Sequence, residues 1–386
     1  MGLMLTTAGE SHGVAMTAML IGLPAGLVLD VGAIDAMLTR RQGGYGRGGR
    51  MTIEEDRVEV EAGLIRGKTL GSPLLLRVRN RDHRIDTAPE VTRPRPGHAD
   101  LAGMMKYGTR DAREVLERAS ARETAARVAA GAVAAQFLLT FGVEVLGFVR
   151  ALGPIRVGTV SEEPGELRRL RDASPFFSPD PAADEEMRAA VDAARAAGDT
   201  LGGVFEVRAF GVPPGLGTCA SHDARLDARL AAAVMSIPAV KGVEIGLGFE
   251  AAARRGSEVH DPIVPGTGRP RRASNRAGGI EGGITNGEPV IVRGAMKPLS
   301  TLMRGLPTVD ARTGAVATGA TERSDVTAVP AASVVGEAVV SLILADALLA
   351  KTGGDSLAEV RRNLEAHLRA AEALFPPAPP AGSPSP

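Results

Sequence analysis

The chain has 386 residues, and its 45 basic side chains are balanced by 45 acidic ones, so its formal net charge is zero. A protein that coats nucleic acid needs a basic surplus, so this balance argues against that class while allowing a local basic pocket. The single cysteine, Cys219, excludes a disulfide framework and favours a reducing compartment. We therefore expect a cytoplasmic protein that does not bind nucleic acid.

Membrane and metal association are not expected either. No amino-terminal segment combines a basic head with an apolar run, and no window approaches the roughly 20 apolar residues that span a bilayer. No spacing of His, Cys and Asp matches a zinc site, so we expect no metal.

The predicted elements alternate between strands and helices from the start of the chain. Strands are expected over residues 4–7 and 14–20, followed by a helix over 34–41. The longest helix signal covers residues 111–141, where Ala, Arg, Glu and Leu dominate and Gly142 supplies a stop.

The later part of the chain continues this alternation. Residues 160–200 are charged and contain prolines, which indicates a loop before a helix from about Asp184 to Ala197. The remaining predictions are a strand over 202–212, a helix over 223–236, a long functional loop over 262–289, a strand over 290–293, and helices over 331–350 and 357–374. Residues 376–386 contain only Pro, Ala, Gly and Ser and predict a disordered tail.

One short segment recurs within the chain. Gly22-Leu-Pro-Ala-Gly-Leu27 is echoed by Gly211-Val-Pro-Pro-Gly-Leu216, and each copy follows a predicted strand and precedes a predicted helix. We interpret residues 1–375 as a single catalytic domain with two related halves, about 3–150 and 200–350, and expect a site at the seam between them. Turns of this type are common, so chance recurrence is the alternative.

The segment from Arg40 to Arg50, Arg-Arg-Gln-Gly-Gly-Tyr-Gly-Arg-Gly-Gly-Arg, holds four arginines and five glycines in eleven residues. Glycine lets the backbone approach a ligand closely, and the planar guanidinium fork matches phosphate or carboxylate oxygens. The segment therefore predicts a wall that binds an anion.

Two of the six histidines lie in unusual settings. His12 follows Ser11 in a loop flanked by glycines, and His98 lies in a Pro-Gly loop near Arg95. A histidine held stiffly among arginines is a candidate general acid, although a loop histidine is more often a plain surface residue. The other four are expected to be structural or exposed: His83, His222, His260 and His367.

Three further segments are suited to anions. Arg118 and Arg122 would share a helix face, so an anion between these like charges would be favoured, unless both are simply solvated. Lys297-Pro-Leu-Ser-Thr301 combines a cation with two hydroxyls. Asp325 follows Arg323 shortly before a helix start, where it either positions a reacting group or caps the helix.

These motifs together resemble the chorismate synthase family over about residues 3–350. The motifs that carry the resemblance are Gly9-Glu-Ser-His-Gly13, Arg40 to Arg50, Arg95-Pro-Gly-His-Ala-Asp100, Ser120-Ala-Arg-Glu-Thr124, Gly278-Gly-Ile-Glu-Gly-Gly283 and Arg323-Ser-Asp325. The resemblance implies an α+β fold, a β-α-β sandwich built from two related halves, assembled as a homotetramer.

The resemblance also implies an activity. Members are redox-neutral lyases that convert 5-enolpyruvylshikimate-3-phosphate into chorismate by a 1,4-anti elimination of phosphate, the last common step of the shikimate pathway, and need reduced FMN. NADPH is one candidate reductant for the flavin.

Residue roles are implied in the same way. His98 would protonate the departing phosphate, His12 would handle a proton at the flavin, and Asp325 with Ser11 would relay a proton at flavin N5. The implied FMN contacts are Arg118, Ala119, Ser120, Pro238, Ala239, Gly282, Lys297, Pro298, Leu299, Ser300, Thr301 and Arg323. The implied substrate or NADP contacts are Arg41, Arg47, Arg50, Arg95 and Arg122. Ala119 stands where many relatives have Ser, and Pro238 where Asn is common.

Two other functions compete with this interpretation. An ordinary flavin- or NADPH-dependent oxidoreductase would use similar cofactor contacts but would consume reductant with every turnover. An RNA-binding module would explain one Arg-Gly-Gly box, but the chain has few aromatic side chains on which bases stack.

Overall fold

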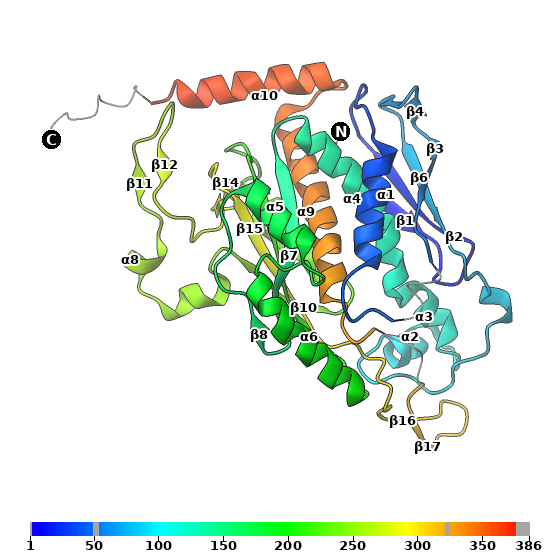
Figure 1. Ribbon diagram of the computed structural model, residues 1–386. Coiled ribbons are helices and arrows are strands. Elements are labelled where there is room, and N and C mark those ends of the chain that lie inside the picture. Colours follow the sequence, from blue (N-terminus) through cyan, green and yellow to red (C-terminus); the bar gives the residue numbers. More distant parts are fainter. Residues whose placement is uncertain (1, 49–53, 321–324, 376–386) are drawn as a thin grey trace.

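The structure, a computed structural model, describes residues 2–48, 54–320 and 325–375. Two antiparallel sheets enclose a layer of helices, so the fold is α+β and has the expected β-α-β layering (Figure 1). Two predicted site residues, Arg50 and Arg323, and the predicted tail 376–386 lie outside the described residues.

Within the described residues, the strands form two main sheets and four small hairpins. The first sheet has the order β1 (Met4–Ala8), β2 (Ala15–Ile21), β6 (Leu74–Arg79), β3 (Val58–Ala62). The second has the order β10 (Val240–Ile245), β15 (Val290–Met296), β9 (Gly203–Phe210), β7 (Glu144–Leu152), β8 (Ile155–Arg156). The hairpins are β4 (Leu64–Ile65) with β5 (Lys68–Thr69), β11 (Ile263–Val264) with β12 (Arg271–Arg272), β13 (Ile280–Glu281) with β14 (Ile284–Thr285), and β16 (Pro307–Val309) with β17 (Val316–Thr318).

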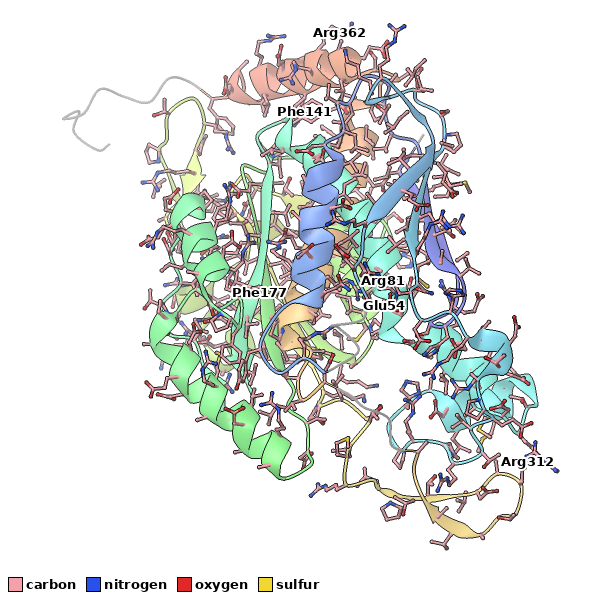
Figure 2. All side chains as sticks on the ribbon, turned by 45° about the vertical axis from the view of Figure 1, so that its right-hand side comes forward. Glu54, Arg81, Phe141, Phe177, Arg312 and Arg362 are labelled. Atoms are coloured by element: carbon pink, nitrogen blue, oxygen red, sulfur yellow. The ribbon has the colours of Figure 1, made fainter. Side chains whose placement is uncertain are left out.

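Four helices fill the space between the sheets: α1 (Val31–Gln42), α4 (Thr124–Leu139), α7 (Leu226–Met235) and α9 (Val329–Thr352). The others lie around this sandwich: α2 (Asp100–Tyr107), α3 (Arg113–Ala119), α5 (Pro164–Ala173), α6 (Pro181–Ala196), α8 (Gly256–Val259) and α10 (Leu357–Glu372). In the view of Figure 2, Arg312 marks the β16–β17 hairpin at the periphery of the molecule.

Helices α4 and α9 run side by side through the centre and make the most extensive contact of any two described elements (Figure 1). A Cβ atom added to Gly131 would lie 2.4 Å from the Cβ of Ala338, so the backbones approach as closely as glycine permits. Helix α9 is long and apolar enough to cross a membrane, contrary to the expectation from the sequence. However, 89% of its most apolar window is buried in the protein, so this helix is the core of the fold.

The two halves share one strand order and one chain path. The order β1-β2-β6-β3 of the first sheet matches β7-β9-β15-β10 of the second. Along the chain, β2, α1, β3, a hairpin, β6 and α4 correspond to β9, α7, β10, a hairpin, β15 and α9. The internal repeat stays a prediction; it put the start of the second half at about residue 200, whereas the matching strand β7 begins at Glu144.

The recurring six-residue turn is held in the same way in both halves. A buried threonine, Thr69 or Thr285, donates its hydroxyl hydrogen to the carbonyl of the third residue of the turn at 2.7 Å in each case. The same hydroxyl accepts the N–H of the sixth residue at 3.0 Å in the first half and 2.9 Å in the second. The two turns therefore share a threonine partner that is distant in the chain, as well as a local sequence.

Three predictions of local structure are wrong. The helix expected over 111–141 is interrupted at Ser120, whose backbone is extended (φ −64°, ψ 141°) and whose hydroxyl accepts the N–H of Arg122. Residues 160–200 contain the unpredicted helix α5, and α6 begins at Pro181, earlier than expected. The loop expected over 262–289 contains the hairpins β11–β12 and β13–β14. The other predicted strands and helices are confirmed within a few residues.

Replacing Thr69 or Thr285 with valine should destabilise the fold by similar amounts, roughly 1–3 kcal/mol each, because each change leaves a buried N–H and C=O without the hydroxyl. Urea unfolding would measure both changes. Thr6→Val, on the exposed face of β1, is the control and should change stability little. A large cost at one position and none at the other would show that the two turns are not equivalent.

Candidate active site

A cavity of about 190 Å³ lies at the seam between the two halves. The first half supplies a polar wall made of Arg41, Arg47, Ser120, Arg122 and Thr124, together with Ala121. The second half supplies a mainly apolar wall made of Ile237, Pro238, Ala239, Met296, Leu299, Ala328, Ala331, Ala332 and Val335, with Asp325 as its charged member. A ligand here would meet guanidinium groups on one side and small apolar side chains on the other.

Equivalent elements of the two halves build these walls. Helix α1 ends in the turn that carries Arg41, and its counterpart α7 is followed directly by 237–239. Residues 120–124 precede and begin α4, while Asp325 and Ala328 precede its counterpart α9. The residues at the break near Ser120 thus line the cavity.

The guanidinium groups of Arg41 and Arg122 share a buried carboxylate. Asp56 lies 2.7 Å from Nη2 of Arg41 and 2.5 Å from Nη1 of Arg122, one carboxylate oxygen for each. Nε of Arg122 donates to Asn80 at 2.7 Å. Glu54 lies near the same group at 3.8 Å, and Figure 2 places Glu54 next to Arg81, whose N–H it accepts at 3.0 Å.

The pKa values follow from burial and charge. Burial is the largest influence on Asp56 and opposes ionisation, but Arg41 and Arg122 together outweigh it and hold its pKa below the usual value. Burial lowers the pKa of Arg41, and the charge of Arg122 lowers it further, while Asp56 raises it. Burial also lowers the pKa of Arg47. Guanidinium pKa values start so high that these groups stay charged.

Asp325 joins the arginine-glycine segment to the start of α9. It lies 2.6 Å from Nη1 of Arg47 and accepts the N–H of Gly48 at 2.6 Å. The predicted partner Ser11 is farther back: its hydroxyl donates to Ser120 at 3.0 Å, and Ser120 lines the cavity. The structure thus connects Ser11 and Asp325 to opposite walls of one cavity.

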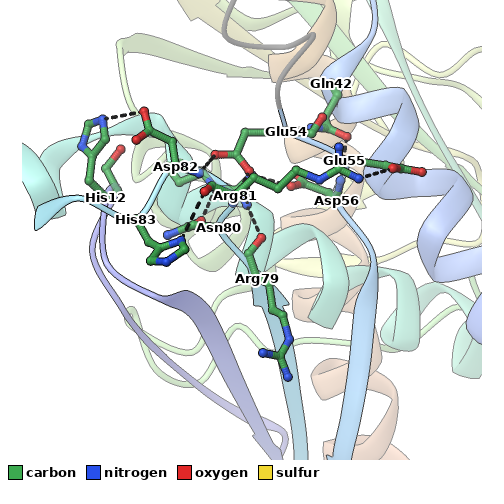
Figure 3. Close-up of polar contacts among 12 residues, drawn as sticks. His12, Gln42, Glu54, Glu55, Asp56, Arg79, Asn80, Arg81, Asp82 and His83 are labelled. Carbon is green, nitrogen blue, oxygen red and sulfur yellow. Dashed lines mark hydrogen bonds and ion pairs between the residues drawn. The ribbon is translucent and has the colours of Figure 1, made fainter.

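His12 is held by a buried carboxylate. Its Nδ1 lies 2.9 Å from Oε1 of Glu117, and its backbone N–H donates to the same side chain at 2.8 Å. Glu117 also lies 3.3 Å from Arg113, and Nε2 of His12 faces Asp82 at 3.9 Å (Figure 3). Burial is the largest influence on Glu117 and opposes ionisation, but the contacts with His12 and Arg113 hold its pKa below the usual value.

His98 is also held by a buried carboxylate, that of Asp100. Its Nδ1 contacts the fully buried Asp100 in a short hydrogen bond, and Asp100 accepts Nε of Arg95 at 2.8 Å. Arg95 also donates to Thr301 at 3.2 Å. Each candidate histidine is therefore oriented through Nδ1 by a carboxylate that an arginine holds, which directs Nε2 away from that carboxylate.

The predicted segment 297–301 is hydrogen-bonded to the loop that carries His98. Lys297 donates from Nζ to the carbonyl of Gly97 at 3.0 Å, and burial, followed by the charge of Lys241, lowers its pKa. Leu299 lines the cavity. Pro238 and Ala239 line it too, and Ala239 adopts a positive φ of 69°, a backbone conformation unusual for alanine.

Other predicted residues lie outside the cavity. Arg118 lines an adjoining groove of about 370 Å³, where it donates to the hydroxyl of Thr7 at 2.8 Å. Gly282 lies in the β13–β14 turn and does not line the cavity. Eight other predicted residues do not line the cavity either: His12, Arg95, His98, Ala119, Lys297, Pro298, Ser300 and Thr301.

Sequence reasoning missed the buried carboxylates Asp56, Asp100 and Glu117. The sequence could have indicated Asp100, because it lies two residues after His98 in the segment from Arg95 to Asp100. Nothing local distinguishes Asp56 from its neighbours Glu54 and Glu55, since its partner Arg122 is 66 residues away. Glu117 likewise meets His12 only across 105 residues.

Asp100→Asn should destabilise the protein by about 3–5 kcal/mol at neutral pH, because Arg95 and His98 lose their buried counter-charge. Burial opposes ionisation of Asp100, but His98 and Arg95 depress its pKa well below the ordinary value of 3.8. The carboxylate therefore stabilises the fold fully above that value, and the stabilisation fades as pH falls below it.

Urea unfolding of the wild-type protein and the variant at about pH 7, 5 and 3 would measure this. The difference should be large at the two higher values and smaller at the lowest. Asp86→Asn, which removes an exposed carboxylate, is the control. A difference that does not depend on pH would contradict the assigned role of the charge.

Comparisons with known proteins agree with the motifs. The family model for chorismate synthase matches residues 3–349. Curated relatives named chorismate synthase include those of Desulforudis audaxviator, 56% identical over 94% of this chain and 96% of the relative, and Geobacter sulfurreducens, 55% identical over 94% and 97%. A crystal structure of chorismate synthase superposes with a TM-score of 0.81 at 44% identity, covering 97% of this chain and 99% of that chain. The chain therefore belongs to the chorismate synthase family.

Proposed function

We propose that this protein catalyses the 1,4-anti elimination of phosphate from 5-enolpyruvylshikimate-3-phosphate to give chorismate, as a carbon–oxygen lyase of the shikimate pathway. The family membership supports this assignment, and relatives that cover nearly the whole chain carry the name chorismate synthase. The structural observation that carries it is the cavity with one cationic and one apolar wall.

The cationic wall suits the charge of this substrate. Two carboxylates and a phosphate bring about −4 of charge, which requires several guanidinium groups within reach. Arg41, Arg47 and Arg122 line the cavity, and the substrate would bind against them. Because the site is largely buried, these groups stabilise charge on the leaving phosphate more strongly than they would in water.

The apolar wall suits a flat ring system. Ala328, Ala331 and Ala332 present only methyl groups, and Leu299 and Pro238 extend the same surface. Reduced FMN, when bound, would supply electron density to the breaking C–O bond and recover it when the ring hydrogen leaves. The cavity is smaller than the 300–1,000 Å³ common for ligand pockets, so binding both molecules requires it to widen.

The histidines would handle protons at the two sides of this cavity. His98, oriented by Asp100, would donate a proton to the departing phosphate, and His12, oriented by Glu117, would handle the proton at the cofactor. Asp325 and Ser11 would relay a proton from opposite walls. In this scheme Arg118 would bind the phosphate side chain of FMN along the adjoining groove.

Several narrower points belong to the same proposal. The remaining predicted contacts would bind cofactor or substrate from segments outside the cavity. NADPH is a candidate reductant for the flavin. We also propose that residues 1–375 act as a single catalytic domain in a cytoplasmic homotetramer. An oxidoreductase would need the same flavin surface, so the stoichiometry of reductant separates the two functions.

The direct test is anaerobic release of phosphate from the enolpyruvyl substrate with dithionite-reduced FMN. We expect chorismate and phosphate in equal amounts, with no consumption of reductant beyond the initial reduction of the flavin. Consumption of one reductant per turnover would favour the oxidoreductase, and no phosphate release would contradict the proposal.

His98→Ala should lower the rate roughly 10²–10⁴-fold with fully reduced FMN, because the general acid for the leaving phosphate is removed. Stopped-flow measurement of phosphate release would give the rate. His222→Ala, which removes an exposed histidine, is the control and should retain full activity. Turnover near that of the wild-type enzyme in His98→Ala would remove His98 from this role.

A further inference from the structure

We propose that Asp56 is a positioning residue that fixes Arg41 for anion binding, with Arg122 as the second guanidinium that holds Asp56 in place. The proposal deepens the proposed function and rests on it for the identity of the anion. Asp56 itself does not line the cavity, whereas Arg41 and Arg122 both do.

Asp56 is placed to act on both arginines at once. Only 2% of the residue is exposed, and its two carboxylate oxygens are divided between Arg41 and Arg122 at 2.7 and 2.5 Å. Arg41 and Arg122 are themselves 4% and 5% exposed. Two like charges buried this closely repel each other, so a carboxylate between them is needed before any ligand arrives.

The two guanidinium groups differ in how many donors remain for a ligand. Arg122 gives Nη1 to Asp56, Nε to Asn80 and Nη2 to the carbonyl of Arg79. Arg41 gives Nη2 to Asp56 and Nη1 to Thr124, but its buried Nε has no hydrogen-bond partner among the described residues. A buried donor without a partner costs stability unless a ligand satisfies it.

The position of Asp56 is set by the helix that carries Arg41. The backbone N–H of Asp56 donates to Oε1 of Gln42 at 3.0 Å, and Nε2 of Gln42 donates to the carbonyl of Glu54 at 3.0 Å. Figure 3 shows Gln42 beside this segment, with Glu54 and Asp56 on neighbouring backbone. Arg41 and Gln42 thus act together: one binds the carboxylate of Asp56 and the other binds its backbone.

Positioning and simple charge balance predict opposite signs. If Asp56 only neutralised charge, removing it would make the cavity more positive and an anion would bind more tightly. If Asp56 positions Arg41, removing it frees the guanidinium group to turn away, and the anion binds less tightly. The direction of the change in affinity therefore decides between the two roles.

The test compares wild-type protein, Asp56→Asn and the control Asp35→Asn by equilibrium binding of inorganic phosphate and of 5-enolpyruvylshikimate-3-phosphate, without flavin. Asp35 also joins α1 to the segment after it, through the N–H of Val58 at 2.8 Å, but lines neither the cavity nor the adjoining groove. We expect Asp56→Asn to weaken binding of both anions by about tenfold or more, and Asp35→Asn to leave it unchanged.

A double-mutant cycle with Arg41→Lys separates positioning from a general effect on the fold. If Asp56 acts through Arg41, Asp56→Asn should cost little further affinity, about threefold or less, in the Arg41→Lys background. In the active enzyme Asp56→Asn should raise KM more than it lowers kcat, because binding of the anion is lost before chemistry. If Asp56→Asn does not fold, Asp56→Glu takes its place in the cycle, since it keeps the charge but displaces the carboxylate.

Two results would overturn the inference: anion binding in Asp56→Asn as tight as or tighter than in the wild-type protein, or additive losses in the cycle. Because phosphate binding requires no turnover, this result is independent of the proposed reaction. Wild-type protein that binds both anions but releases no phosphate would contradict the proposed function and leave the role of Asp56 supported.

Discussion

The arrangement of the cavity depends on one electrostatic constraint: guanidinium groups buried at a seam must be compensated before a ligand is present. Arg41, Arg47 and Arg122 would repel one another in a site with little water, and Asp56 and Asp325 provide the opposing charges. The same constraint extends to the histidines, because Asp100 and Glu117 are each held between a histidine and an arginine. Charge compensation therefore fixes the geometry of the polar wall.

The two walls of the cavity are unlike, although the sheets behind them share one strand order. Both halves use the same strand order and the same threonine-closed turn, so equivalent backbone segments reach the seam from opposite sides. The side chains on those segments differ: Arg41 lies in the last turn of α1, while 237–239 follow α7 with Ile, Pro and Ala. One scaffold thus supplies charge on one side and an apolar surface on the other.

Patterns in the sequence predicted most elements of this fold and several residues of its cavity, while the layering came from the resemblance to a known family. Periodicity and turn residues located most strands and helices, and the repeated turn pointed to a seam between halves. The helix prediction over 111–141 failed at Ser120. There the hydroxyl of Ser120 caps the next turn and accepts a hydrogen bond from the distant Ser11, and these contacts override local helix propensity. Sequence reasoning also failed for the buried carboxylates Asp56 and Glu117, whose importance arises only when distant segments meet.

The contact between Gly131 and Ala338 limits how this protein can change during evolution. Helices α4 and α9 touch almost backbone to backbone, so any larger side chain at that point would push the halves apart. The cavity is lined by the first turns of these same two helices, so a change at this contact would also reach the cavity. Lineages that acquire a different ligand preference would have to do so through the surrounding loops, and the paired helices should change more slowly than those loops.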